Sequence, residues 1–320
     1  MPRALPLAAV LVLSLAACGG DPSSSGAGGD GAGAAGGSGP GPGSGGGSTS
    51  GSGGGGASGD WETLVQGDWE LPPGSESYTC VIATVPEQVF IGAYRPIAPE
   101  GTHHTVLTKI SSGQDGTFPC DAGTNGQNMI YGSGVGTQEE SLPEGVAVRL
   151  EAGDKVLLNL HLYNTSTSPI TGTSGIQIKR LDPATVQEEA ASVLAGPVAL
   201  NIPPQNTTTQ TGYCTIPSDV TLFSIGPHMH QLGTHMTVTA ITGSGSDVLH
   251  DAPYTFDDQR HYYLEQPIQL KAGDQVKVDC TYNNTTNSTV TFGDSSDAEM
   301  CFAGLFLTPA TAPFGLVCIN

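Results

Sequence analysis

The stretch that decides the fold is Leu150–Asn164, "LEAGDKVLLNLHLYN", together with its echo at Leu270–Asn284, "LKAGDQVKVDCTYNN". Both contain Leu-x-Ala-Gly-Asp-x-Val, then an alternating run, then Tyr-Asn. A turn followed by period-two alternation is typical of a β-strand that leaves a hairpin, and the turn alone is common. Because histidines also lie roughly 50 residues upstream in each half, we predict two β-domains of one plan, each contributing one site.

The sequence around these stretches predicts an all-β protein. Short runs rich in Val, Ile, Thr and Tyr recur between Gly, Pro, Asn and Asp clusters, a spacing that favours sandwiches and jelly rolls. We expect two tandem antiparallel jelly-roll or β-sandwich domains, at residues 60–190 and 191–320. The one stretch with helical character, "DPATVQEEAASVL" at 182–194, falls between them. A short helix or an extended linker there would form the domain junction.

The first 18 residues have the pattern of a targeting segment. Arg3 precedes an apolar run that is too short to span a bilayer, and "LAAC" ends at Cys18. This end resembles the lipobox of bacterial lipoproteins, in which the cysteine becomes lipid-modified and forms the mature N-terminus; an ordinary secretory signal is the alternative. We predict a lipid anchor at Cys18 and a place in the bacterial cell envelope. The lack of Asp directly after Cys18 favours the outer membrane.

Residues 19–59 are almost entirely Gly, Ser, Ala and Pro. Such a composition buries too little apolar surface to offset the entropy of ordering, so we expect a disordered tether.

The charge balance limits the partners of the protein. Thirty acidic residues oppose ten basic ones, whereas phosphate contacts need clustered Lys and Arg. We therefore exclude nucleic acid as a partner and expect a soluble monomer that the tether holds at a membrane. Six cysteines follow Cys18, and an even number in an exported protein predicts three disulfides. Six cysteines allow 15 pairings.

Two histidine motifs carry the chemistry. His103 and His104 stand side by side in strand-like "GTHHTVLTKI", where a regular pleat would aim them at opposite faces. His228 and His230, in "GPHMHQLGTHM", have the spacing at which a regular strand brings both imidazoles to one metal ion. Imidazole suits Cu, Zn, Fe and Ni, and a thioether such as that of Met300 prefers Cu(I).

The motifs resemble those of the copper type II, ascorbate-dependent monooxygenases, the family of peptidylglycine α-hydroxylating monooxygenase and dopamine β-monooxygenase. That family has a His-His pair and a lone His for one copper, then His-x-His and Met-Cys for the other. This chain has "THHTVL", "LHLYN", "HMHQLG" and "EMC" in that order. Supporting stretches include "ESYTC", "FPCDAGTNGQNMIYG" and "LPEGVAV", so that the resemblance runs from about Tyr78 to the C-terminus.

The resemblance implies two copper ions, with ascorbate or a similar reductant as co-substrate. The electron-transfer copper would be bound by His103, His104 and His161, and the catalytic, O₂-activating copper by His228, His230 and Met300. The resemblance also implies the disulfides Cys80–Cys120, Cys280–Cys301 and Cys214–Cys318. If it holds, the backbone at His103 and His104 must depart from a regular pleat.

The chain departs from the peptide-processing members at the substrate clamp. Where those enzymes have Arg, Tyr and Asn for the substrate carboxylate, this chain has Gly226, Gly304 and Phe302. We therefore expect a more apolar pocket and a substrate other than a glycine-ended peptide. We expect His250 and His261 to be hydrogen-bonded core residues, while the role of His235 is open.

Two functions fit these motifs. The first is a copper monooxygenase that hydroxylates a C–H bond of a small extracellular molecule with O₂. The alternative is a non-catalytic copper-binding or redox-sensing surface lipoprotein. A β-sandwich adhesin without metal is a weaker third reading.

Overall fold

The computed structural model describes residues 60–121, 123, 128–293, 295 and 297–310, and the backbone of 317–318. The targeting segment, Cys18 and the Gly-rich tether lie outside the described residues. The described residues all belong to one compact unit. Within the described part of the chain no helix has the length and hydropathy to cross a membrane.

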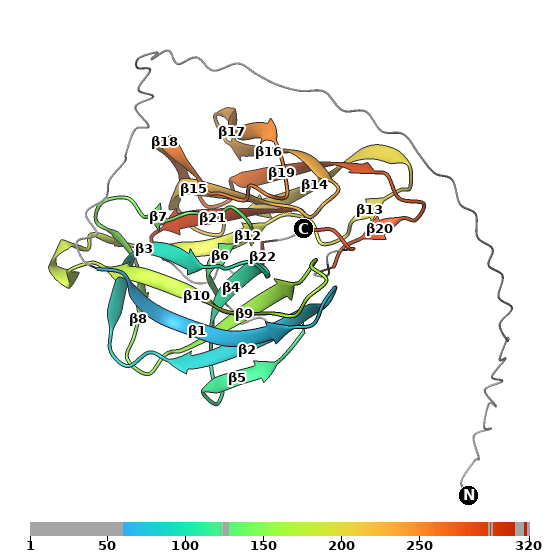
Figure 1. Ribbon diagram of the computed structural model, residues 1–320. Helices are drawn as coiled ribbons and strands as arrows, with labels where there is room; N and C mark the ends of the chain where they lie inside the picture. Colours follow the sequence, from blue (N-terminus) through green and yellow to red (C-terminus); the bar gives the residue numbers. More distant parts are fainter. Residues whose placement is uncertain are drawn as a thin grey trace, which may run out of the picture. The chain divides into compact units, whose positions relative to one another are not determined.

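The fold is all-β, as predicted, and the first half is built from two sheets (Figure 1). One sheet has the strand order β1-β10-β3-β8-β11, with β7 pairing β3, and the other has the order β5-β2-β9-β4-β6. The bounds of these strands are β1 Glu62–Leu71, β2 Glu76–Thr84, β3 Val89–Ile97, β4 Thr102–Ile110, β5 Gly116–Pro119, β6 Asn128–Ser133, β7 Glu140–Ser141, β8 Val146–Leu150, β9 Lys155–Tyr163, β10 Ile170–Arg180 and β11 Glu188–Glu189.

The second half repeats this arrangement. Its sheets have the orders β18-β15-β21-β12-β22 and β14-β19-β16-β17, and β13 pairs with β20. The bounds of these strands are β12 Ala191–Ala195, β13 Asn201–Ile202, β14 Asn206–Thr215, β15 Val220–His228, β16 Gly233–Thr242, β17 Gly245–Pro253, β18 Tyr262–Leu270, β19 Gln275–Asn284, β20 Val290–Thr291, β21 Phe302–Thr308 and β22 Val317–Cys318.

The two echo stretches occupy the same place in the two halves. They form β9, between β2 and β4, and β19, between β14 and β16. Each strand leads into a turn that an asparagine organises. Asn164 accepts from the backbone N–H of Ser166 and donates to the carbonyl of Ser168, and Asn284 does the same with Thr286 and Ser288. The sequence echo is therefore a structural repeat; the predicted domain boundaries stay a prediction.

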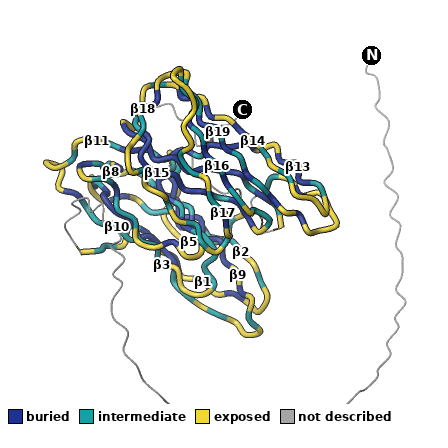
Figure 2. The backbone as a smooth tube through the Cα atoms, turned by 90° about the horizontal axis from the view of Figure 1, so that it is seen from above, coloured by how far each residue is buried: buried dark blue, intermediate teal, exposed yellow. Residues whose placement is uncertain are grey.

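Apolar side chains of both sheets fill the interior of each half. Along β19 buried positions alternate with more exposed ones, as a strand with one covered face requires, and the exposed loop tips can be followed in Figure 2. The core of the first half also contains Phe223 and Phe306, which come from β15 and β21 of the second. The halves thus share apolar packing.

The region between the halves is not helical. Pro183–Thr185 form a single 3₁₀ turn that Asp182 caps, and the extended strands β11 and β12 follow. The expectation of a helix at 182–194 was wrong and the extended alternative holds, because residues 188–189 pair with β8 and residues 191–195 with β21.

Two of the three implied disulfides are present, Cys80–Cys120 and Cys280–Cys301. Cys214 is also disulfide-bonded. The side chain of Cys318 lies outside the described residues, so its pairing with Cys214 stays a prediction.

Candidate metal centre

The first histidine pair lies on a distorted strand, as predicted. On β4, Thr102 pairs with Leu162 of β9, and His104 pairs with His161, the very next residue back along β9. His103 is therefore an extra residue in the ladder, which is a β-bulge. The bulge turns the ring of His103 to the face that His104 occupies, so that both rings lie against His161, at centroid distances of 4.6 and 4.5 Å.

The three rings converge through the same type of nitrogen. His161 Nδ1 lies 3.0 Å from His103 Nδ1 and 3.2 Å from His104 Nδ1. Donor atoms of all three residues lie within 4.8 Å of one another, the one such group of three or more His, Cys, Asp or Glu residues found in the described part of the chain. Three imidazole nitrogens that lie around one position fit a copper ion.

Two residues that the sequence analysis did not single out hold His161 in place. The Glu76 carboxylate lies 2.5 Å from His161 Nε2, so that the Nε2–H donates to it and the Nδ1 lone pair remains for a metal. The ring of Tyr78 stacks on that of His161 at 4.4 Å. Both residues lie on β2, which pairs with β9, and "ESYTC" was noticed only as part of the family resemblance.

The second pair is built differently from the prediction. His228 is the last residue of β15, and His230 lies beyond the strand, so no regular pleat aligns the two rings. A turn with a hydrogen bond from Gly233 N–H to the His230 carbonyl follows at once. The ring centroids are nevertheless 5.4 Å apart.

Hydrogen bonds choose which nitrogen of each ring is free. The His228 Nδ1–H donates to Gln259 Oε1 at 2.8 Å, and the His230 Nδ1–H donates to the Ala298 carbonyl at 3.0 Å. Both rings therefore keep the Nε2 lone pair. The second pair presents Nε2, whereas the first cluster presents Nδ1.

At the second pair, a buried glutamate holds the backbone of the segment that follows β15. Glu299 is fully buried, and its two carboxylate oxygens accept the backbone N–H groups of His230 and Leu232 at 2.8 and 2.7 Å. Burial raises the pKa of Glu299 to about 7. The sequence analysis missed this residue, although it stands directly before Met300 in "EMC"; an acidic residue next to a predicted ligand was the available signal.

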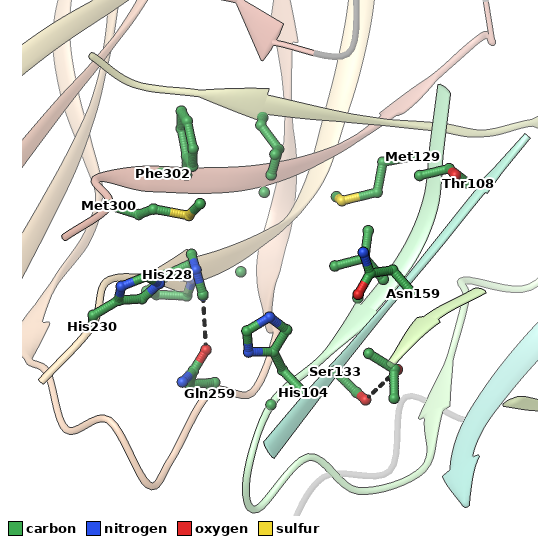
Figure 3. A pocket seen from close by; sticks show the side chains of 18 of the residues that line it. His104, Thr108, Met129, Ser133, Asn159, His228, His230, Gln259, Met300 and Phe302 are labelled. Atoms are coloured by element: carbon green, nitrogen blue, oxygen red, sulfur yellow. Dashed lines mark hydrogen bonds between the residues drawn. The ribbon is translucent and has the colours of Figure 1, made fainter. Parts of the chain in front are cut away.

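Met300 lies between two fixed points of the chain. Glu299 precedes it, the Cys280–Cys301 disulfide follows it, and Tyr282 Oη donates to its carbonyl at 2.6 Å. Figure 3 shows its side chain alongside the rings of His228 and His230. The sequence-predicted thioether thus stands beside the second pair.

The five imidazoles are kept neutral by their surroundings. Burial, with help from neighbouring imidazoles, lowers the pKa of His103 and of His228 to about 4. Burial lowers the pKa of His104, His161 and His230 as well. At neutral pH all five rings therefore carry the lone pairs that a metal needs.

The two groups of histidines adjoin each other. The ring centroids of His104 and His228 are 6.4 Å apart, with the ring planes nearly perpendicular, and the two side chains lie near each other in Figure 3. The segment after β17 fixes this arrangement, because Thr137 Oγ1 of the first half donates to the Gln259 carbonyl at 3.0 Å. Gly136 has a φ of +83°, and a Cβ there would lie 2.6 Å from the Asp257 carbonyl oxygen, so only glycine allows this close approach.

A pocket of about 400 Å³ opens beside both groups and is lined by residues of both halves. Gly226, Phe302 and Gly304 are part of its wall, with Met129 and Phe292, which supports the expectation of an apolar pocket. No Lys, Arg, Asp or Glu is among its described lining residues.

The remaining histidines lie apart from the two ligand groups. His235 is partly exposed on β16 with Asp251 3.5 Å away, and His250 packs on Tyr262. Neither His250 nor His261 has the expected role of a hydrogen-bonded core residue, because His250 is only half-buried on the largely exposed β17 and His261 lines the pocket.

Residues 189–311 match the family model described as copper type II ascorbate-dependent monooxygenase, C-terminal domain. Peptidyl-glycine alpha-amidating monooxygenase A of Xenopus laevis is 24% identical over 267 residues, which cover 78% of this chain and 28% of the relative. DBH-like monooxygenase protein 1 of Gallus gallus is 24% identical over 292 residues, which cover 77% of this chain and 46% of the relative. The chain thus spans less than half the length of either curated relative.

Among solved structures, one of allantoicase is similar at a TM-score of 0.19 and 12% identity, covering 65% of this chain and 76% of that chain, a likeness too low to bear on the fold. By these comparisons the chain is similar to the copper type II, ascorbate-dependent monooxygenase family, and its second half matches the model of that family's C-terminal domain.

Proposed function

We propose that this protein is a copper monooxygenase that hydroxylates a C–H bond of a small molecule with O₂ and an ascorbate-type reductant. The observation that carries the proposal is the pairing of two unlike nitrogen donor sets beside one apolar pocket. His103, His104 and His161 present Nδ1 atoms, whereas His228 and His230 retain Nε2.

The donor sets fit two copper ions with different tasks. Three imidazoles at the first cluster suit an ion that stores and passes one electron. Two imidazoles with the thioether of Met300 favour Cu(I), the form that reacts with O₂. Copper bound at these two places supplies one-electron transfer and dioxygen binding.

The residues of the chain prepare both places. Glu76 keeps the proton of His161 on Nε2, and Gln259 keeps that of His228 on Nδ1, so each ring is held in one tautomer. The adjoining rings of His104 and His228 leave a short path between the two ligand sets. The apolar wall around Phe302 keeps water from a substrate in the pocket.

We also propose that the protein works as a monomer in the bacterial cell envelope, held at the membrane through a lipidated Cys18. This part rests on the sequence alone. Mass analysis of the protein extracted from membranes tests it, since a lipid-modified Cys18 at the N-terminus is expected and an unmodified cysteine would contradict it.

The test of the activity begins with metal analysis of the full chain, for which two copper ions per chain are expected. Oxygen uptake with ascorbate is then measured across a set of C–H substrates. Met300→Ile should abolish substrate-dependent uptake, and His235→Ala, away from both donor groups, should leave it intact. Two bound copper ions without any substrate-dependent uptake would favour the non-catalytic copper-binding alternative. Turnover that survives Met300→Ile would contradict the assignment of the second site.

A further inference from the structure

One imidazole in the pocket wall takes no part in either donor group. His261 lies over Gly226, which pairs with Gly304 where β15 meets β21. A Cβ built at Gly226 would lie 2.2 Å from His261 Cδ2 and 2.5 Å from its Nε2. The ring of His261 therefore fills the space that any side chain at position 226 would need.

A buried carboxylate of the other half faces this ring. Glu140 Oε2, on β7, lies 2.8 Å from His261 Nδ1, and the two side chains are only 10% and 12% exposed. The N–H does not point straight at the oxygen, so the contact is an approach of a negative charge to the N–H dipole and not an aligned hydrogen bond. Among the described residues, no Lys or Arg forms an ion pair with Glu140, and its Oε1 has no hydrogen-bond partner.

The carboxylate decides what His261 offers to the pocket. A negative charge beside Nδ1 holds the ring proton there and leaves Nε2 as an acceptor. No residue in the described part of the chain hydrogen-bonds to Nε2, and the ring borders the pocket.

Apart from the nitrogens that His104, His228 and His230 offer to a metal, the other polar side chains of the pocket wall already have partners. Thr105 and Ser133 bond each other at 2.8 Å, and Gln259 binds His228 and the Phe256 carbonyl. A ligand that enters this pocket thus meets an apolar wall with the acceptor of His261 in it.

We propose that His261, positioned by Glu140, selects the substrate by accepting a hydrogen bond from a hydroxyl or amine on an otherwise apolar molecule. The pair carries no net positive charge, so it disfavours a carboxylate, which would lie next to the buried negative charge of Glu140. That the selected molecule is then hydroxylated rests on the proposed function; its binding does not.

Calorimetric binding of three probes with one carbon skeleton tests the proposal: benzyl alcohol, benzylamine and benzoate, each added to the copper-loaded full chain without reductant. The wild type should bind the alcohol and the amine at least about tenfold more tightly than benzoate. His261→Phe should weaken the alcohol roughly 3- to 10-fold, the range for one hydrogen bond. His235→Phe, the same change at a partly exposed position of β16, should not. Any direct coordination of a probe to copper contributes equally in the wild type and in both variants. The difference in probe affinity between the variants therefore reports on His261.

Glu140→Gln separates positioning from a structural role. It keeps the shape, and thermal unfolding confirms that the variant folds. The preference over benzoate should shrink because the charge is gone, while the alcohol stays within about threefold of the wild type. Wild-type preference for benzoate, or an unchanged probe preference in both His261→Phe and Glu140→Gln, would overturn the proposal. Neither result depends on oxygen uptake, so a failure here is distinct from a failure of the monooxygenase assignment.

Discussion

The two histidine groups use the same side chains but opposite ring nitrogens, and they lie on different sheets of the repeated plan. The first group lies on β4 and β9, in the sheet of the echo strands. The second starts at the end of β15, in the other sheet of its half. The two halves therefore share one strand arrangement, but their histidine groups lie at different positions in it.

The devices that hold the ligands differ in the same way. At the first group a bulged strand brings adjacent histidines to one face, and Glu76 bonds a ligand ring. At the second a loop carries His230, and Glu299 bonds the backbone of that loop. A carboxylate supports each site, but one orients a ring and the other shapes the chain.

The largest expected effect comes from His161→Ala, which removes the ring that His103 and His104 both face. Bound copper should fall from two ions to one per chain, and ascorbate-dependent oxygen uptake should fall more than about 100-fold, beyond the loss typical of an outer-shell partner. Metal analysis and an oxygen electrode measure these values. Two retained copper ions would show that the cluster is not a site.

Glu299→Gln should affect only the second group. One backbone N–H loses its acceptor, so the free energy of unfolding should fall by about 1–3 kcal/mol. Copper affinity at the second site should fall roughly 10- to 100-fold while the first site is unchanged. Chemical denaturation and copper titration measure these effects, with Glu265→Gln on exposed β18 as the matched control. Equal weakening of both sites would contradict separate supports.

Glu76→Gln is the mirror experiment at the first group. The neutral amide oxygen accepts from His161 Nε2–H more weakly than the carboxylate does, so copper affinity of the first site should fall about 10-fold. The exposed Glu70→Gln on β1 is the control. A loss of copper affinity at the second site, with unchanged affinity at the first, would contradict the separate roles of Glu76 and Glu299.

The smallest effect is expected for Gln259→Leu, which removes the acceptor for His228 Nδ1. The backbone contact of residue 259 with Thr137 remains, so we expect a loss of about threefold in affinity at the second site, within the range of one neutral hydrogen bond. Gln269→Leu on exposed β18 serves as the control in the same titration. An equal loss of copper affinity in this control would show that the hydrogen bond between His228 and Gln259 does not contribute to affinity.

The sequence predicted the ligand groups better than their supports. The alternation of residue types predicted the strands. Adjacent histidines on a regular strand would point to opposite faces, and this conflict predicted the irregular backbone at His103. The spacing of His228 and His230 misled, because strand periodicity says nothing about where β15 ends. Glu76, Glu299 and Gln259 act through contacts between segments far apart in the chain, which no local pattern encodes. The 182–194 stretch has helical composition, but pairing with β8 and β21 overrode it.

The central claim is that sulfur belongs to the second site alone, and X-ray absorption of the Cu(I)-loaded His161→Ala chain tests it most directly. With the first site removed, the remaining copper should show one sulfur scatterer together with imidazole nitrogens, and adding Met300→Ile should remove the sulfur. A sulfur-free spectrum of the His161→Ala chain, with copper still bound, would contradict the account.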